Sequence, residues 1–325
     1  MKVLVYSARP DEMEFFKHFA KQFDLEMGYC QYELNMDIVE RAKGYEALLC
    51  VGNDKLNGEI LEKFASFGIK YISMRTIGYD NVDMEVARKL GIRVAHATYS
   101  PYSVANYTVM LMIMCLRKAL YIMMRSQTGD YSLTFVKGRE MQNMTVGIVG
   151  TGRIGRAVIQ NLSGFGCKIL AYSPHVKEIP NVENISLEEL YKRSDIISLH
   201  TVLNNDTYHM INKNSIAKMK KGAIIINTAR GPLIDTADLI AEIENGHVAS
   251  VGIDCFEEEN GIVHTNHNYS LINNHDMIIL KSFPNTIVTP HVAFYTDQAV
   301  QDMVYTAMEN VVLFRDNKVV PLEVK

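Results

Sequence analysis

The fold of this chain is decided by residues 146–155, which read VGIVGTGRIG. A mainly apolar run leads directly into the pattern G-x-G-x-x-G, formed by Gly150, Gly152 and Gly155. The first glycine permits a tight turn, the second lets the backbone approach a pyrophosphate, and the third lets a helix pack closely on the preceding strand. The N-terminus of that helix offers N–H groups and a partial positive charge to a phosphate. The stretch therefore indicates a candidate phosphate-binding loop.

The surroundings of the glycine pattern strengthen this interpretation. A strand is predicted before it at 145–149, a helical pattern runs to about Phe165, and a second strand is predicted at 168–172. Because these parts follow the order of a strand–helix–strand unit, a dinucleotide site is a better interpretation than a structural turn. We expect the cofactor to contact the whole loop: Gly150, Thr151, Gly152, Arg153, Ile154 and Gly155.

Short β-rich runs alternate with helical patterns along the chain, which is typical of α/β proteins with parallel sheets. One set of strands is predicted at 3–6, 47–51, 71–74 and 93–95, with helices at 11–23, 58–67 and 82–90 between them. A second set is predicted at 145–149, 168–172, 196–200, 223–227, 249–253 and 286–289. A final amphipathic helix is predicted at 296–314, and packing on the N-terminal part is one interpretation of it. We therefore predict an α/β fold with two parallel sheets.

One further predicted helix, from about Ser103 to Met124, carries apolar residues around nearly its whole circumference. Such a helix is buried on more than one side. It is interpretable as a core helix or as a subunit interface, since stable interfaces resemble a protein core. Its place at the junction between the two sets of strands favours the interface.

The composition limits the class of protein. A length of 325 residues predicts about two domains. The apolar fraction of 48% and the charged fraction of 22% are those of an ordinary globular protein, and a net charge of −4 argues against a nucleic-acid binder. The longest apolar run, 109–116, is shorter than the ~20 residues of a membrane span. The five scattered cysteines read as reduced thiols, so we expect a cytoplasmic protein. From the net charge and the short apolar runs we expect neither nucleic-acid nor membrane partners.

The end of the second strand of the dinucleotide unit departs from the pattern typical of NAD sites. An acidic residue is expected there to bind the ribose 2′-hydroxyl, but the chain has Ser173, His175 and Lys177, with no carboxylate before Glu178. A serine can donate to a 2′-phosphate, and the two basic side chains would add positive charge. We therefore expect NADP(H) to be accepted as well as NAD(H). The alternative is that NADH binds adequately without the acidic contact.

Polar side chains follow the later strands of the second set. Arg230, Asp254 and His291 come directly after three different strands, and Glu259 lies in the loop after Asp254. Ligands of open parallel sheets bind outside the carboxyl ends of the strands, so we expect these residues to line one crevice. Each residue type alone is common on a surface or in a core, but their joint placement makes a purely structural role a poor explanation.

The chemistry of these residues suits the reduction of a 2-oxo acid. The guanidinium of Arg230 matches a carboxylate in a bidentate fashion. A carbonyl that receives hydride needs a proton donor, and an imidazolium such as that of His291 is the usual one near neutral pH. The carboxylate of Glu259 would favour the charged form of the ring and orient it.

The chain resembles the D-isomer-specific 2-hydroxyacid dehydrogenase family over nearly its whole length. The motifs that carry this resemblance are GTGRIG (150–155), MKKGA (219–223), NTARG (227–231), DCFEEE (254–259) and TPH (289–291). The stretches KYISMRTIG (70–78), YSP (99–101) and HVAFYT (291–296) are similar to its D-lactate dehydrogenase branch. Residues 143–173 are similar to the D-lactate dehydrogenases of vancomycin-resistance operons, which also lack the acidic residue.

The resemblance implies a Rossmann coenzyme domain, 99–295, inserted in a flavodoxin-like catalytic domain made of 1–98 and 296–325. It implies that Arg230 binds the substrate carboxylate, that His291 is the general acid/base and that Glu259 is its partner. The expected substrate-binding residues are Ile77, Gly78, Tyr99, Arg230, His291 and Tyr295. The expected cofactor-binding residues outside the glycine loop are Ser173, His175, Lys177, Thr201, Val202, Thr207, Thr228, Ala229 and Asp254. It also implies a homodimer formed through the helix at 103–124.

The expected reaction is the reduction of pyruvate to D-lactate with NAD(P)H. Because Tyr99, Phe294 and Tyr295 suit a methyl group or an aromatic ring, a dehydrogenase of 2-hydroxyisocaproate or phenyllactate is the alternative. An NAD(H)-sensing protein without activity is a second alternative from another class. His264, His267 and His275 lie in an Asn-rich stretch, which we interpret as a solvated loop rather than a metal site, so no metal is expected.

Overall fold

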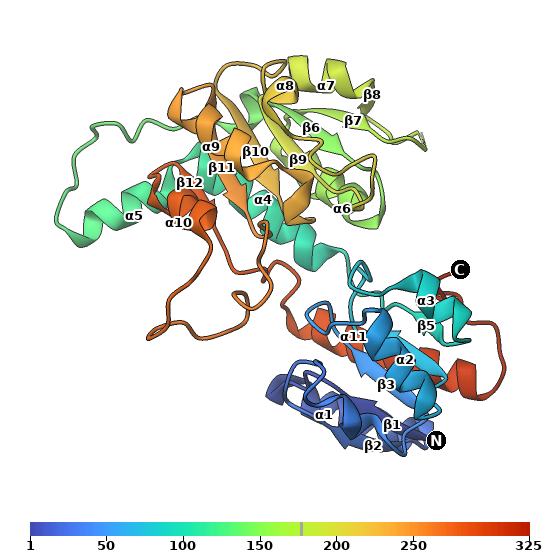
Figure 1. Cartoon of the computed structure of the whole chain (residues 1–325). Coiled ribbons are helices and arrows are strands. Elements are labelled where there is room, and N and C mark those ends of the chain that lie inside the picture. Colours follow the sequence, from blue (N-terminus) through green and yellow to red (C-terminus); the bar gives the residue numbers. More distant parts are fainter. Residues whose placement is uncertain (176–177) are drawn as a thin grey trace. The chain divides into compact units, whose positions relative to one another are not determined.

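The computed structural model describes residues 1–175 and 178–325, and it forms two compact units. The terminal unit consists of Met1–Ser100 and Tyr295–Lys325, and the central unit of Pro101–Phe294. Each unit has its own parallel sheet with helices on its faces (Figure 1). The predicted fold class, α/β with two parallel sheets, is confirmed.

The terminal unit contains a five-stranded parallel sheet in the order β2-β1-β3-β4-β5, which is the flavodoxin-like order. Its strands are β1 (Lys2–Val5), β2 (Glu26–Tyr29), β3 (Ala47–Cys50), β4 (Tyr71–Met74) and β5 (Arg93–Ala95). Its helices are α1 (Met13–Phe23), α2 (Gly58–Ser66), α3 (Met84–Lys89) and α11 (Asp297–Arg315). Because α11 packs on α1 and β4, the C-terminal segment completes the unit that the N-terminal segment begins.

Both faces of this sheet are covered. Successive side chains of a strand point to opposite faces, so Leu48 and Leu49 of β3 enter two different apolar clusters. One cluster contains Phe64 of α2, and the other contains Val311 of α11. This explains why β3 reads as an unbroken apolar run rather than an alternating one.

A buried ion pair joins the carboxyl ends of this sheet. The Arg75 guanidinium follows β4 and lies 3.0 Å from the Glu12 carboxylate, with both side chains fully buried. Arg75 also donates to the carbonyl of Tyr6, which follows β1, and to that of Leu49 in β3. The charge is therefore compensated on all sides, as a buried charge requires.

The central unit contains a seven-stranded parallel sheet in the order β12-β11-β10-β9-β6-β7-β8. From β6 onward this is the order 3-2-1-4-5-6 of a Rossmann fold, with one more strand at the edge. Its strands are β6 (Thr145–Val149), β7 (Lys168–Tyr172), β8 (Glu183–Asn184), β9 (Ile196–Leu199), β10 (Ala223–Asn227), β11 (Val248–Ile253) and β12 (Thr286–Val288). Its helices are α4 (Tyr102–Leu116), α5 (Ala119–Gln127), α6 (Arg153–Leu162), α7 (Leu187–Arg193), α8 (Lys213–Ile216), α9 (Thr236–Glu244) and α10 (His275–Ser282).

The prediction of one helix from Ser103 to Met124 is wrong. The chain bends by 65° between α4 and α5. Helix α4 ends at Leu116, with Arg117 as its C-cap, and Lys118 adopts a left-handed conformation with φ of 52°, which a continuous helix excludes. Deep burial is confirmed for α4, whereas no residue of α5 is buried.

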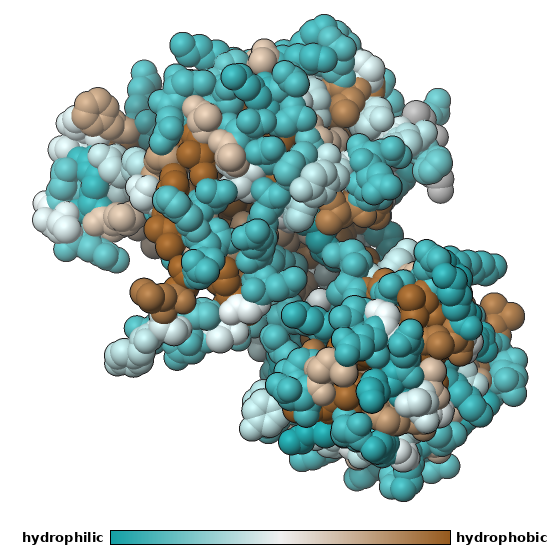
Figure 2. Space-filling model, in the orientation of Figure 1, coloured by the Kyte–Doolittle hydropathy of each residue, from teal (hydrophilic) through white to brown (hydrophobic). Residues whose placement is uncertain are grey.

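Figure 2 shows one face of the molecule, which is mostly hydrophilic and carries an apolar strip on the central unit beside α10. Ile278 of α10 is half-exposed.

Within the described residues, no single helix is long and apolar enough to cross a membrane. Only the bent pair of α4 and α5, taken together, has the length and composition that a membrane-spanning segment needs.

Candidate functional site

The carboxyl ends of five strands of the central sheet lie in one register. Val149 pairs with Leu199, Leu199 with Asn227, Asn227 with Ile253, and Ile253 with Val288. The residue that follows each of these therefore lies at the same edge of the sheet. That next row consists of Gly150, His200, Thr228, Asp254 and Thr289, so the glycine loop and the predicted polar residues share one edge.

The glycine loop fits a pyrophosphate. Gly150 has φ of 98°, and a Cβ there would collide with the carbonyl of His200. A Cβ at Gly155 would collide with the carbonyl of Gly150, whereas one at Gly152 would meet only open space. Gly152 is also the N-cap residue of α6, and it has no side chain that could cap the first N–H groups of that helix. Space for an anion and N–H donors therefore coincide at this point.

The other residues expected at the cofactor are placed by their strands. Ser173 follows β7 and is half-buried, His175 is exposed, and Lys177 lies outside the described residues. After β9, Thr201 is half-buried and Val202 is exposed.

Three of the four remaining cofactor candidates hold loops of the protein itself. The Thr207 hydroxyl donates to the Val202 carbonyl at 2.7 Å. The Thr228 hydroxyl lies 2.8 Å from that of Thr108 on α4, and the Ala229 N–H donates to the Asn227 side chain at 3.0 Å. Their contact with a cofactor remains a prediction.

Arg230 lies close to the segment that carries Glu259. Its neighbour Gly231 approaches the backbone of Phe256 so closely that a Cβ would collide with it. The Asn227 side chain donates to the Arg230 carbonyl at 2.8 Å, and the Arg230 guanidinium donates to the Ala229 carbonyl at 2.8 Å. The loops after β10 and β11 are thus pressed together at the position of the arginine.

Asp254 is fully buried and fixes the loop after β12. Its carboxylate accepts hydrogen bonds from the Thr289 hydroxyl at 2.5 Å, the Val292 N–H at 3.0 Å and the Ala293 N–H at 2.8 Å. The backbone N–H of His291 donates to the Asp254 carbonyl at 2.8 Å. Because Asp254 binds the loop through both its side chain and its backbone carbonyl, it positions His291. Its expected contact with the cofactor stays a prediction.

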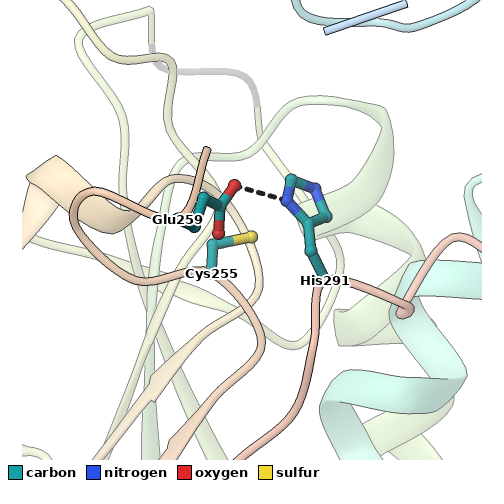
Figure 3. A group of neighbouring side chains, drawn as sticks. All are labelled: Cys255, Glu259 and His291. Atoms are coloured by element: carbon teal, nitrogen blue, oxygen red, sulfur yellow. Dashed lines mark hydrogen bonds and ion pairs between the residues drawn. The ribbon is translucent and has the colours of Figure 1, made fainter. Parts of the chain in front are cut away.

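Glu259 and His291 form the central pair of the site. The His291 Nδ1 lies 2.6 Å from the Glu259 Oε1, while Glu259 Oε2 accepts from the Phe256 N–H at 3.1 Å (Figure 3). The side chains are 27% and 17% exposed, so the pair is largely shielded from water but reachable. Cys255 lies beside both side chains and is buried.

The surroundings of His291 change its protonation. Burial lowers the pKa of His291, but the adjacent Cys255 and the hydrogen-bonded Glu259 carboxylate raise it, and the net pKa is well above its usual range. Burial in turn raises the pKa of the Cys255 thiol, although His291 opposes this. The hydrogen bond to Glu259 therefore favours the imidazolium form of His291, and burial favours the neutral thiol form of Cys255.

The histidine-rich loop does not gather into a metal site. His264 lies 2.8 Å from the His291 carbonyl oxygen, and His267 binds the side chain of Ser270 and the carbonyl of Ile262. Among the described residues, the one group of three potential ligands is Cys255, Glu259 and His291, and it includes none of the three histidines of that loop. Sequence reasoning had not singled out Cys255 or the contact of His264, since neither follows from a motif.

The remaining candidates belong to the terminal unit. The Thr76 hydroxyl donates to the Gly78 carbonyl at 2.6 Å in the turn that also holds Ile77. Tyr99 is half-buried, and Tyr295 is half-exposed with its ring 5.7 Å from the Arg9 guanidinium. Their roles in binding a substrate are predictions.

Comparison with known proteins identifies the family. The model of the D-isomer specific 2-hydroxyacid dehydrogenase, NAD binding domain, matches residues 109–293. The chain belongs to the D-isomer-specific 2-hydroxyacid dehydrogenase family. It is 42% identical to an aromatic 2-oxoacid reductase of Clostridium sporogenes, with 95% of each chain covered.

Solved structures agree with this assignment. A D-2-hydroxyisocaproate dehydrogenase superposes with a TM-score of 0.89 at 35% identity, covering 100% of this chain and 99% of the other. A D-lactate dehydrogenase with NAD+ from Lactobacillus jensenii superposes with a TM-score of 0.85 at 30% identity, with both chains covered completely. As a member of the D-lactate dehydrogenase branch of this family, the chain is an NAD-dependent oxidoreductase.

The raised pKa of His291 predicts the pH dependence of this dehydrogenase. With His291 as the predicted proton donor, reduction requires the protonated ring, so the rate should be full below the raised pKa and fall as the pH rises through it. Glu259→Gln removes the negative charge and should move this alkaline limb to lower pH, whereas Glu258→Gln, at an exposed neighbour, should leave it in place. The measurement is kcat/KM for a 2-oxo acid as a function of pH. An alkaline limb that is the same in Glu259→Gln and in the unmodified protein would contradict the pairing.

Proposed function

We propose that this chain reduces a 2-oxo acid stereospecifically to the D-2-hydroxy acid, with pyruvate as the expected small substrate. The observation that carries the proposal is the hydrogen bond between His291 and Glu259 at the edge of the sheet that also holds the glycine loop. When bound, the nicotinamide cofactor supplies the hydride that adds to C2 of the substrate. A purely NAD(H)-sensing protein would not need a paired, protonated imidazole beside an arginine loop.

The side chains divide the remaining work. Arg230 binds the substrate carboxylate, because a planar guanidinium matches its two oxygens. Glu259 occupies Nδ1 of His291, so Nε2 is the atom that gives its proton to the substrate oxygen. In the reverse direction the neutral ring accepts that proton from the hydroxyl group. The buried Asp254 keeps the loop of His291 in place during both steps.

Replacing His291 should show this division most clearly. His291→Ala removes the proton donor, so kcat should fall by ~10²–10⁴-fold while cofactor affinity changes little. Arg230→Lys keeps the charge but loses the bidentate geometry, so it should mainly raise KM for the 2-oxo acid. Steady-state kinetics with pyruvate, together with cofactor titration by fluorescence, separate the two effects. Turnover equal to that of the unmodified protein would remove the substituted residue from the mechanism.

The side chain of the substrate has a second candidate, an aromatic ring. It is favoured by the 42% identity to an aromatic 2-oxoacid reductase over nearly the whole chain. A panel of pyruvate, 2-oxoisocaproate and phenylpyruvate compares the values of kcat/KM directly. The highest value for phenylpyruvate would replace pyruvate by an aromatic substrate and leave the roles of His291 and Arg230 unchanged. No turnover with any of the three would favour the sensing protein.

We also propose that NADPH is accepted beside NADH, because Ser173 stands at the end of β7 where a carboxylate would repel a 2′-phosphate. Ser173→Asp should lower kcat/KM for NADPH and spare NADH, since the new charge repels only the phosphate. Ser163→Asp, at an exposed position beyond α6, serves as the control with the same added charge. A strong preference for NADH in the unmodified protein that persists unchanged in Ser173→Asp would exclude the phosphate interaction.

The apolar surface of α4, of α5 and of the turn after α6 supports the proposal of a homodimer. A groove of about 470 Å³ is lined by the apolar residues Val109, Met110, Ile113, Met114 and Phe165 together with Asn106 and Asn161. Met123 and Met124 of α5 are more than half exposed. Exposed apolar patches of this kind mark interaction sites. Met110→Glu should therefore shift the protein from dimer to monomer in sedimentation velocity, while Val319→Glu on the terminal unit should not. A monomeric unmodified protein would contradict the proposal.

A further inference from the structure

We propose that Cys255, Glu259 and His291 form a binding site for a thiophilic divalent cation such as Zn²⁺, and that the cation inhibits the enzyme. The three side chains offer one ligand atom each, and these atoms all lie within 4.8 Å of one another (Figure 3). All three come from the loops after β11 and β12, so the group belongs to one unit of the fold.

The ligand set is the main argument. A thiolate, an imidazole nitrogen and a carboxylate oxygen are the three kinds of ligand that Zn²⁺ takes in proteins, and the thiolate selects against Mg²⁺ and Ca²⁺. Zinc bonds of about 2.0–2.3 Å in tetrahedral geometry hold ligand atoms about 3.4–3.8 Å apart. An ion between them requires the 2.6 Å distance between His291 Nδ1 and Glu259 Oε1 to lengthen, which rotation of the Glu259 side chain supplies. The fourth position stays open.

The position of the three side chains allows a cation to enter the site and to stay bound there. His291 is 27% exposed and gives an ion access from the solvent side, whereas Cys255 is buried and lies at the closed end. The carboxylate of Glu259 is already held by the Phe256 N–H, which fixes one ligand in advance. A partly preformed site of this kind lowers the ordering that binding requires.

Binding is a displacement of protons. The cation forms bonds to Cys255 Sγ, Glu259 Oε1 and His291 Nδ1, and it releases the thiol proton and the proton between Nδ1 and Glu259 to the solvent. The ring is then a neutral, metal-bound imidazole that still holds the Nε2 proton, and giving up that proton would leave an imidazolate, so the ring can neither donate to the substrate oxygen nor accept a proton at Nε2. Loss of turnover rests on the proposed function of His291, whereas the binding of the cation does not.

The test uses the full-length protein with Zn²⁺ and Co²⁺ salts. Zn²⁺ should inhibit turnover, and EDTA should reverse the inhibition. Cys255→Val removes one ligand and keeps the pair of Glu259 and His291, so the inhibition constant, compared with the rate of the same variant without metal, should rise at least about tenfold. Cys167→Val, at a half-buried cysteine of the same unit, is the matched control and should respond like the unmodified protein.

A second readout does not depend on activity. One equivalent of Co²⁺ should give a thiolate-to-cobalt charge-transfer band in the near ultraviolet in the unmodified protein and in Cys167→Val, but not in Cys255→Val. The absence of this band in the unmodified protein overturns the proposal even if a variant fails to fold, and so does a band that persists in Cys255→Val. If the band is present but no 2-oxo acid is reduced, the metal site stands and the proposed function fails.

Discussion

The buried carboxylate of Asp254 is the constraint on which the rest of the site depends. His291 adopts φ of 53°, a left-handed conformation that costs a residue with a Cβ roughly 1–2 kcal/mol. The loop keeps this conformation because Asp254 binds a hydroxyl and two backbone N–H groups of the following and preceding residues, and its own carbonyl binds the N–H of His291. The strained backbone of His291 is thus held in place by the Asp254 carboxylate, which the surrounding hydrogen-bond donors stabilise.

The second condition is that the sheet brings the loops after its strands together at one edge. Five strand ends lie in register, and glycines are found where the loops that follow them come closest. Gly150 touches the backbone of His200, and Gly231 touches that of Phe256, so that any side chain there would separate the loops. Backbone packing at the edge therefore determines how near Arg230, Glu259 and His291 lie, before any substrate is present.

Much of this was predictable from local patterns. The strands β4, β5, β6, β7 and β10 have the predicted bounds, because each is an apolar run with a clear stop. The convergence of polar residues was predictable because parallel strands share one carboxyl edge. The edge strands β2 and β8 were not predicted, because a half-exposed or two-residue strand carries no apolar period. The break at Lys118 was missed because apolar residues resume directly after Arg117 and Lys118, and two charged residues alone do not indicate a change of backbone conformation.

The chemistry beside His291 was predictable only in part. Glu259 follows from its chemistry and its place after a strand. Cys255 reaches the same imidazole, and His264 the backbone carbonyl of His291, through loop geometry that no spacing rule contains. Their presence matters because a negative charge in a site shielded from water attracts a metal cation as well as a proton. The carboxylate that keeps a proton on the imidazole also attracts a metal ion, and the buried thiol determines which metal competes best. The proposed proton donor and the proposed metal ligand set are therefore two states of one arrangement, and under these proposals the concentration of thiophilic cations decides between them.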